Sequence, residues 1–545
     1  MKKVVNAILS NERVLLFLIL MTGGLTPGLL SQTVDTLDVN DIRTGISSAG
    51  SLFYGPDGNA SFEVPKGSGL HSLYRGNLWI GAFDDNDNLR LAAQTYGQSG
   101  DDFFAGPLAN VYDSTYDAHY HRLWKIDQTT IDLHKANWNT LGYVMPEVIE
   151  NWPAHGDTSN GEAPFLAPFE DVNHDLVYTP AAGDYPKIRG DQAIFFIIND
   201  DRSIHTESGG DKLGVEIHGL VYAFDTLVFP ALHQSIFVHY SIFNRRNTTF
   251  TNTYLGLWVD YDIGVFGDDQ VGCDTILNAS FGYNATNNDM AGNYGYGSGP
   301  PSVATLFLNQ PMTAFVYYDN DFSVTGNPSL PAHYYQYMQG VWKDNKPMSV
   351  GGTGYNPALP NPFTTYMFPG DPVTGTGWVA ADAGQPNGAD RRGLMSHGPF
   401  DLLPHTSLCL DVGFIWARDK TGTNLTSLSL MKSRIVEAQN HYLAQNYNCY
   451  DTLSPVNGIF PESLLAGVSI YPNPADDQLF ISLTEPVDAP LEITVFDLQG
   501  RVAGKARFPV GTNTMEITIA GLASGFYSAE IRSGDRLVRK KFIRK

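Results

Sequence analysis

The chain has 545 residues, and its 34 Lys and Arg against 57 Asp and Glu give a formal net charge of −23. One hydrophobic core rarely serves more than about 250–300 residues, so this length predicts several folded units. The negative charge argues against nucleic acid and anionic membrane surfaces as partners, and it favours cations.

Residues 1–31 have the pattern of a secretory signal peptide. Lys2, Lys3 and Arg13 precede a short apolar run at residues 14–21, which a small residue, Ser31, follows. The run is shorter than the ~20 residues that cross a bilayer. We therefore expect a mature chain that begins near Gln32 and has no transmembrane helix.

Residues 32–165 are predicted to form an N-terminal β-rich domain. His119 and His121 would share one face of a strand there, which is a spacing that zinc sites use. Because no third ligand is near in the sequence, surface histidines are the favoured interpretation.

The stretch "EDVNHDLVYTPAAGDYP", residues 170–186, resembles an oxygen-coordinated calcium loop. Its candidate ligands are the side chains of Asp171, Asn173, Asp175 and Asp184 and the carbonyl of Val177. Leu176 and Ala182 stand where an EF-hand has Gly and Glu, and Asp and Asn also cluster in plain turns. The prediction is a structural calcium ion, and a solvated turn is the alternative.

Residues 166–449 are predicted to be the main β-sandwich domain. Its strand-like runs alternate at period two, as in "QSIFVHYSIFN", where Ile236, Val238, Tyr240 and Ile242 share a face. We expect one face of these strands to be buried and the other partly wet. Gly-, Asn- and Pro-rich stretches at 282–302 and 351–387 predict long loops.

A second acidic cluster follows the strand-like "TYLGLWV". It consists of Asp260, Asp262, Asp268, Asp269 and Asp274. Carboxylates packed this closely repel one another unless a cation neutralises them, so a second calcium site is predicted, with an exposed acidic loop as the alternative. Paired carboxylates could also hydrolyse a glycan.

"DRR" at 390–392 predicts a turn closed by an Asp–Arg pair, with an anion-binding site as the other interpretation.

The remaining signals in the main domain concern one helix, the cysteines and the tryptophans. A helix is predicted near residues 427–445, where Leu428, Met431, Ile435, Ala438 and Tyr442 recur at spacings of three and four. Of the three cysteines, Cys409 is predicted to be a buried free thiol, and Cys273 with Cys449 is the candidate disulfide. Trp79, Trp342 and Trp378 are possible sugar-stacking platforms, with core packing as the default.

Residues 450–467 are predicted to be a linker, and 468–545 a small β-sandwich. "YPNPADDQLFISL", "VFDLQGR", "LASGFYSAEI" and "KKFIRK" occur there in order. Together they resemble the immunoglobulin-like C-terminal sorting domain of type IX (Por) secretion system cargo. The resemblance implies a Bacteroidota-type host, engagement of the type IX machinery by residues 468–545, and export to the cell surface or the medium. In such cargo the domain is usually cleaved on export.

The body, in blocks such as "FEVPKGSGLHSLYRGNLWIGAFD" and "GDYPKIRGDQAIFFIIND", resembles large extracellular proteins of the same bacteria. No HExxH, GxSxG or glycine-rich phosphate loop is present in the sequence. The fold class predicted is all-β, with sandwich domains and one helix. The function predicted is a secreted or surface protein, calcium-stabilised, for adhesion, glycan binding or structure. The alternative is an extracellular hydrolase of polysaccharide or protein.

Overall fold

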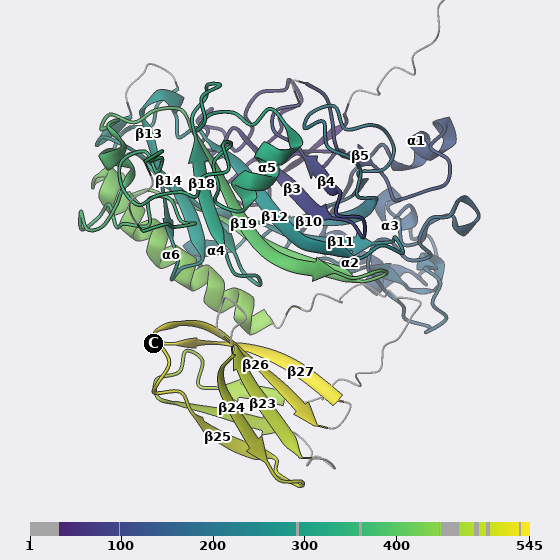
Figure 1. The fold of residues 1–545 in the computed structure, drawn as a ribbon. Coiled ribbons are helices and arrows are strands. Elements are labelled where there is room, and N and C mark those ends of the chain that lie inside the picture. Colours follow the sequence, from purple (N-terminus) through teal and green to yellow (C-terminus); the bar gives the residue numbers. More distant parts are fainter. Residues whose placement is uncertain are drawn as a thin grey trace, which may run out of the picture. The chain divides into compact units, whose positions relative to one another are not determined.

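The structure is a computed structural model, and it describes residues 32–97, 99–289, 294–358, 362–445, 447, 468–483, 490–496, 502–533 and 536–545. Strands dominate the described residues (Figure 1). The predicted all-β class is confirmed. The predicted signal peptide, Cys449 and the predicted linker lie outside the described residues.

The larger sheet of the body has nine strands. Along its main path the order is β13 (Asp269–Asp274), β14 (Ala279–Asn284), β17 (Ser302–Phe307), β20 (Ser407–Ala417), β11 (Ser235–Asn244), β10 (Val215–Ala223), β9 (Gln192–Asn199) and β5 (Phe104–Ala105). β6 (Trp124–Asp127) also pairs with β9. All of these pairings are antiparallel.

The smaller sheet of the body has five strands, in the order β18 (Ala314–Tyr318), β19 (Arg391–Leu402), β12 (Phe250–Tyr261), β3 (Arg75–Phe83) and β4 (Leu89–Ala93). β3 and β4 come from the predicted N-terminal block, whereas β12, β18 and β19 come from the predicted main block. Strands of the two blocks therefore pair within one sheet.

The two faces of the larger sheet belong to two hydrophobic cores. In β9, Ile194, Phe196 and Ile198 enter the inner core, which the smaller sheet also lines, and Phe195 and Ile197 enter the outer core. The period-two pattern thus assigns alternate residues to opposite faces. The face that was predicted in β11, with Ile236, Val238, Tyr240 and Ile242, is part of the inner core.

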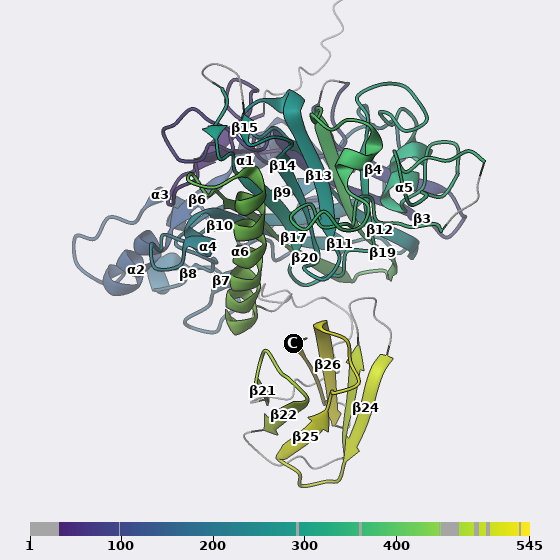
Figure 2. The ribbon, with the colours of Figure 1, turned by 90° about the vertical axis from the view of Figure 1, so that its left-hand side faces the viewer.

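The prediction that the opposite face of these strands is partly wet is wrong. All ten residues of β11 are buried. α6 (Asn424–Gln445) lies against β14, β17 and β20 (Figure 2) and covers that face with the five apolar residues predicted for it. Further cover comes from residues 106–190, which hold α1 (Ser114–Tyr120), α2 (Gln128–Asn137), α3 (Glu147–Glu150), η1 (Thr158–Asn160) and η2 (Pro180–Ala182).

The long loops of the main block cover the smaller sheet. Within them, α5 (Pro331–Met338) packs on β12 and β4, and η4 (Ala380–Ala383) follows. A Cβ added at Gly81 in β3 would lie 2.8 Å from Tyr335 and 2.9 Å from Met338, so glycine permits this close approach. Trp79, Trp342 and Trp378 are 0–7% exposed, so core packing is the correct interpretation for each.

The shorter elements of the body complete its edges and loops. They are β1 (Val34–Leu37) with β2 (Thr44–Ser47), β7 (Phe169–Glu170) with β8 (Tyr185–Pro186), β15 (Asn288–Asp289) with β16 (Gly297–Ser298), α4 (Pro230–His233) and η3 (Phe266–Asp268).

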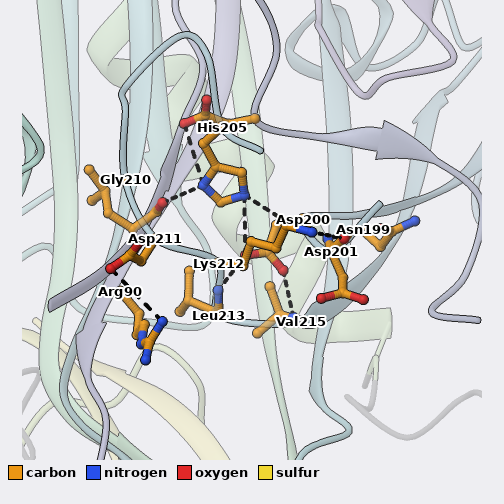
Figure 3. Close-up of polar contacts among 12 residues, drawn as sticks. Arg90, Asn199, Asp200, Asp201, His205, Gly210, Asp211, Lys212, Leu213 and Val215 are labelled. Carbon is orange, nitrogen blue, oxygen red and sulfur yellow. Dashed lines mark hydrogen bonds and ion pairs between the residues drawn. The ribbon is translucent and has the colours of Figure 1, made fainter. Parts of the chain in front are cut away.

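A buried histidine ties the smaller sheet to the loop that follows β9 (Figure 3). His205 Nδ1 lies 2.7 Å from the carbonyl oxygen of Leu91 in β4, and Nε2 lies 2.7 Å from that of Asp200. Each ring nitrogen therefore lies within hydrogen-bond distance of a backbone carbonyl oxygen of a different segment, which holds the two segments together. The carboxylates of Asp102 and Asp200 also lie near the ring, 4.0 Å from Nδ1 and 3.6 Å from Nε2.

Residues 468–545 form a separate small sandwich. One sheet contains β21 (Val468–Tyr471), β22 (Gln478–Leu483) and β25 (Thr514–Thr518), and the other contains β24 (Val502–Phe508), β23 (Leu491–Phe496), β26 (Gly525–Ser533) and β27 (Arg536–Arg544). Its own core includes Leu491, Ile493, Val495, Met515 and Ile519, as the alternation in the sequence predicts.

The cysteine predictions are wrong. Cys409 is in a disulfide, and Cys273 is a free, buried thiol whose Sγ lies 3.3 Å from the carbonyl oxygen of Met367. Burial raises the pKa of the Cys273 thiol. That thiol behaves as a small apolar core residue, which is the role predicted for Cys409.

Candidate metal centre

The loop at residues 170–186 is closed by the pairing of β7 with β8. Asp171 accepts the backbone N–H of Leu176 at 2.7 Å and that of Asp175 at 3.2 Å. Burial opposes the charge of Asp171, but the N–H groups of Leu176, Asp175 and His174 hold its pKa below the usual value. The carboxylate is therefore ionised at neutral pH.

The backbone of this loop turns where a calcium loop turns. His174 and Leu176, at the fourth and sixth positions from Asp171, have φ of 62° and 63°. Leu176 thus adopts the left-handed conformation for which an EF-hand uses glycine. The Asp175 and Asp184 carboxylates also accept backbone N–H groups, at 2.8 Å from Val177 and 2.7 Å from Thr179.

The loop at residues 170–186 belongs to the outer layer of the body. It lies in the layer over the outer core, where the ring of His134 in α2 contacts the carbonyl oxygen of Asp184 at 3.0 Å. Ordering of the loop therefore acts on this outer layer.

The second acidic cluster separates into three places. Asp260 is the second-last residue of β12, and Asp262 lies just beyond the strand. Asp260, Asp262 and Asp390 each have one carboxylate oxygen that lies within 4.8 Å of those of the other two. Asp269 is fully buried at the start of β13, where it accepts the N–H of Ile263 at 2.9 Å. Asp268 lies in η3. Burial raises the pKa of Asp269 well above its usual value, and the nearby carboxylates of Asp262 and Asp268 raise it further.

Asp274 lies apart from this group, at the other end of β13. Its carboxylate pairs with Lys432 of α6 at 3.1 Å and caps the following turn through the N–H of Leu277. It therefore already has a cation, Lys432, as its partner.

Two oxygens of the Asp260, Asp262 and Asp390 centre are available to a ligand. Asp260 is 3% exposed, and its Oδ1, like Oδ1 of Asp262, is buried without a hydrogen-bond partner. Burial raises the pKa of Asp260 to about 7 despite the nearby Arg392. Burial raises the pKa of Asp262 well above its usual value, and the nearby carboxylates of Asp260 and Asp390 raise it further. A bound cation would relieve this repulsion.

Two arginines partly neutralise the centre. Asp260 pairs in the sheet with Arg392 on one side and Arg75 on the other. Arg392 Nη2 donates to Asp390 at 2.7 Å, and its Nε donates to Tyr96 Oη, which in turn donates to Asp260 at 2.7 Å. Three carboxylates against two guanidinium groups leave the centre net negative when ionised.

Asp390 and Tyr96 belong to this centre, although the sequence pattern predicts neither of them as a member. The predicted Asp–Arg pair in "DRR" is present, as Asp390 with Arg392. Nothing in the sequence indicates that this pair reaches Asp260, which lies 130 positions earlier, because the strand pairing of β12 with β19 brings them together.

His119 and His121 do not form a metal pair. They lie at the end of α1 and not on a strand, and positions two apart on a helix point in different directions.

A second buried network of polar side chains lies between β11, β20 and α6. The sequence pattern does not predict it. Ser241 Oγ is 3.0 Å from His239 Nε2, and His239 Nδ1 is 2.7 Å from Asp411. Asp411 also accepts from Arg189 at 2.7 Å and from Tyr442 of α6 at 2.5 Å. The order of contacts is that of a Ser–His–Asp triad, but Ser241 is 3% exposed on a regular strand, unlike an accessible nucleophile. The network therefore holds α6 to the sheet.

Comparison with known proteins identifies the C-terminal unit. Residues 469–545 match the family model described as a secretion system C-terminal sorting domain. The chain is a type IX secretion cargo protein. It is handled by that machinery and leaves the cell. Among the described residues, no helix has the length and apolar character needed to cross a membrane.

No curated protein matches the chain. Among solved structures, a DUF3244 family protein from Bacteroides vulgatus with an immunoglobulin-like β-sandwich is 20% identical, with a TM-score of 0.13, over 14% of this chain and 84% of that one. A polysaccharide lyase is 8% identical, with a TM-score of 0.19, over 60% of this chain and 34% of that one. Neither likeness bears on activity.

Proposed function

We propose that the exported protein is a non-enzymatic extracellular or surface protein whose sandwich body is stabilised by calcium. The observation that carries the proposal is the convergence of Asp260, Asp262 and Asp390, with Oδ1 of Asp260 buried and without a partner. The donors are all oxygens, which suits a hard cation such as Ca²⁺ better than zinc or copper. Backbone carbonyls or water would supply the remaining ligands.

The site joins segments that are distant in the sequence. Asp260 lies near the end of β12, a central strand of the smaller sheet, and Asp262 follows this strand. Asp390 ends the long loop region that covers this sheet, directly before β19. A cation held by all three would fix the loop to the strand. We propose that the loops so fixed present a binding surface for a glycan or another surface ligand.

The proposal is tested with the chain lacking residues 1–31, by calorimetric titration with Ca²⁺ and by thermal unfolding with and without chelator. A site that binds only the folded state contributes about 2.7 kcal/mol at a roughly hundredfold excess over Kd. Asp260→Asn with Asp262→Asn should remove one bound ion and its share of the calcium-dependent rise in Tm. Asp132→Asn, on the exposed face of α2, is the matched control. Equal stoichiometry in the wild type and the double variant would reject the site.

The same variants address the alternative, an extracellular hydrolase. A protonated carboxyl beside an ionised one is what general acid–base catalysis needs, and the raised pKa of Asp260 provides such a pair. A screen on polysaccharides and proteins that found turnover, lost in Asp260→Asn, would replace the non-enzymatic proposal.

A further inference from the structure

Arg392 occupies the place of a counter-cation in the acidic centre. Its side chain is 4% exposed, and it contacts Asp390 directly and Asp260 through Tyr96. Nη1 of the same guanidinium is buried without a hydrogen-bond partner. The guanidinium group of Arg392 therefore contributes to the centre through its positive charge at least as much as through its hydrogen bonds.

We propose that Arg392 sets the calcium affinity of the centre: it keeps the ion-free site folded, and it weakens binding by repelling the incoming ion. This inference rests on the calcium site of the proposed function. In the ion-free state the guanidinium offsets part of the repulsion among Asp260, Asp262 and Asp390. In the ion-bound state the same charge lies near a divalent cation, and at short range in a partly buried site that repulsion is large.

The two effects have opposite signs, which distinguishes this role from a purely structural one. Removal of the charge should lower the stability of the ion-free protein. It should increase the additional stability that bound calcium provides. A residue that only holds strands together would lower both. A weak site would load at the 10⁻⁴–10⁻³ M typical of extracellular modules, which is where this cargo works.

The test compares Arg392→Gln with the wild type. Each chain is prepared in calcium, and its affinity is measured by competition with a chelator of known affinity, so that a variant unstable without the ion can still be measured. Arg392→Gln should bind Ca²⁺ roughly tenfold or more tightly. Its Tm should fall below that of the wild type in excess chelator, and the gain on adding calcium should be larger.

Two controls separate charge from position. Arg392→Lys keeps the positive charge but loses the geometry of the guanidinium hydrogen bonds, so its calcium affinity should stay closer to that of the wild type than to that of Arg392→Gln. Arg90→Gln removes one positive charge at the opposite end of β3, where Arg90 pairs with Asp84 at 2.7 Å, and it should leave the affinity unchanged.

The outcomes are distinct. If the wild type binds calcium and Arg392→Gln binds it equally or more weakly, the role of Arg392 is rejected and the site stands. If neither chain binds, both proposals are rejected. If Arg392→Gln alone shows measurable binding, the suppressing effect of the arginine is supported.

Discussion

Asp411 is a buried carboxylate of the outer layer that three side chains contact. Burial opposes its charge, but Arg189, His239 and Tyr442 hold its pKa far below the usual value. Removal of one partner from a buried ion pair leaves an uncompensated charge, which costs about 3–5 kcal/mol.

Asp411→Asn should therefore lower the free energy of unfolding by about 3–5 kcal/mol in urea denaturation, because Arg189 and His239 lose their anion. Asp132→Asn on the surface should change it by less than about 0.5 kcal/mol. A loss below 1 kcal/mol at Asp411 would mean that the network contributes little to holding α6.

The acid dependence of stability follows from the same residue. The depressed pKa means that the contribution of Asp411 is complete above the unfolded pKa of about 3.9 and is lost as pH falls below it. Denaturation measured from pH 7 to pH 3 should show a steeper loss for the wild type than for Asp411→Asn. Parallel curves would contradict this assignment.

At the scale of elements, helix α6 and the strands follow from periodicity, but the environment of their polar positions does not. His239 and Ser241 alternate with apolar residues in β11, so the sequence indicates a wet face. They are buried because Ser241 contacts His239, and His239 contacts Asp411, which lies 172 positions away in the sequence. Asp411 in turn accepts from Arg189, which lies 50 positions before His239. The acidic cluster at residues 260–274 is evident in the sequence because its carboxylates are close together along the chain. Asp390 reaches the same centre only through the pairing of β12 with β19.

The loop between β7 and β8 is expected to bind a calcium ion of its own. Asp171→Ala with Asp175→Ala should abolish the part of calcium binding and of the calcium-dependent Tm that this loop contributes, since both carboxylates would be ligands. Calorimetric stoichiometry should fall by one ion. If the wild type and the double variant bind equal numbers of ions and melt alike with and without chelator, residues 170–180 are only a turn.

At the scale of the whole molecule, the body and the sorting domain have separate hydrophobic cores. Each can fold without apolar surface from the other. Chains that end before Val468 should therefore fold but lack the export signal.

Removal of residues 468–545 should leave a folded body in the periplasm and none outside the cell, measured by fractionation and protease resistance. The full chain in the same host is the control. A truncated protein found outside at the normal level would contradict the sorting role, and a protease-sensitive one would contradict independent folding.

The position of β13 at the border of the larger sheet has a consequence for solubility. An outermost strand offers unpaired N–H and C=O groups on which a second chain can aggregate, and inward-pointing charges discourage this. β13 begins with the buried Asp269 and ends with Asp274, and Ala389 bridges it from the long loop region. The backbone N–H of Cys273 in β13 also donates to Phe368, and all residues of β13 except Asp274 are buried. The covering loops and the charges at both ends of the strand therefore protect this border from pairing with a second chain.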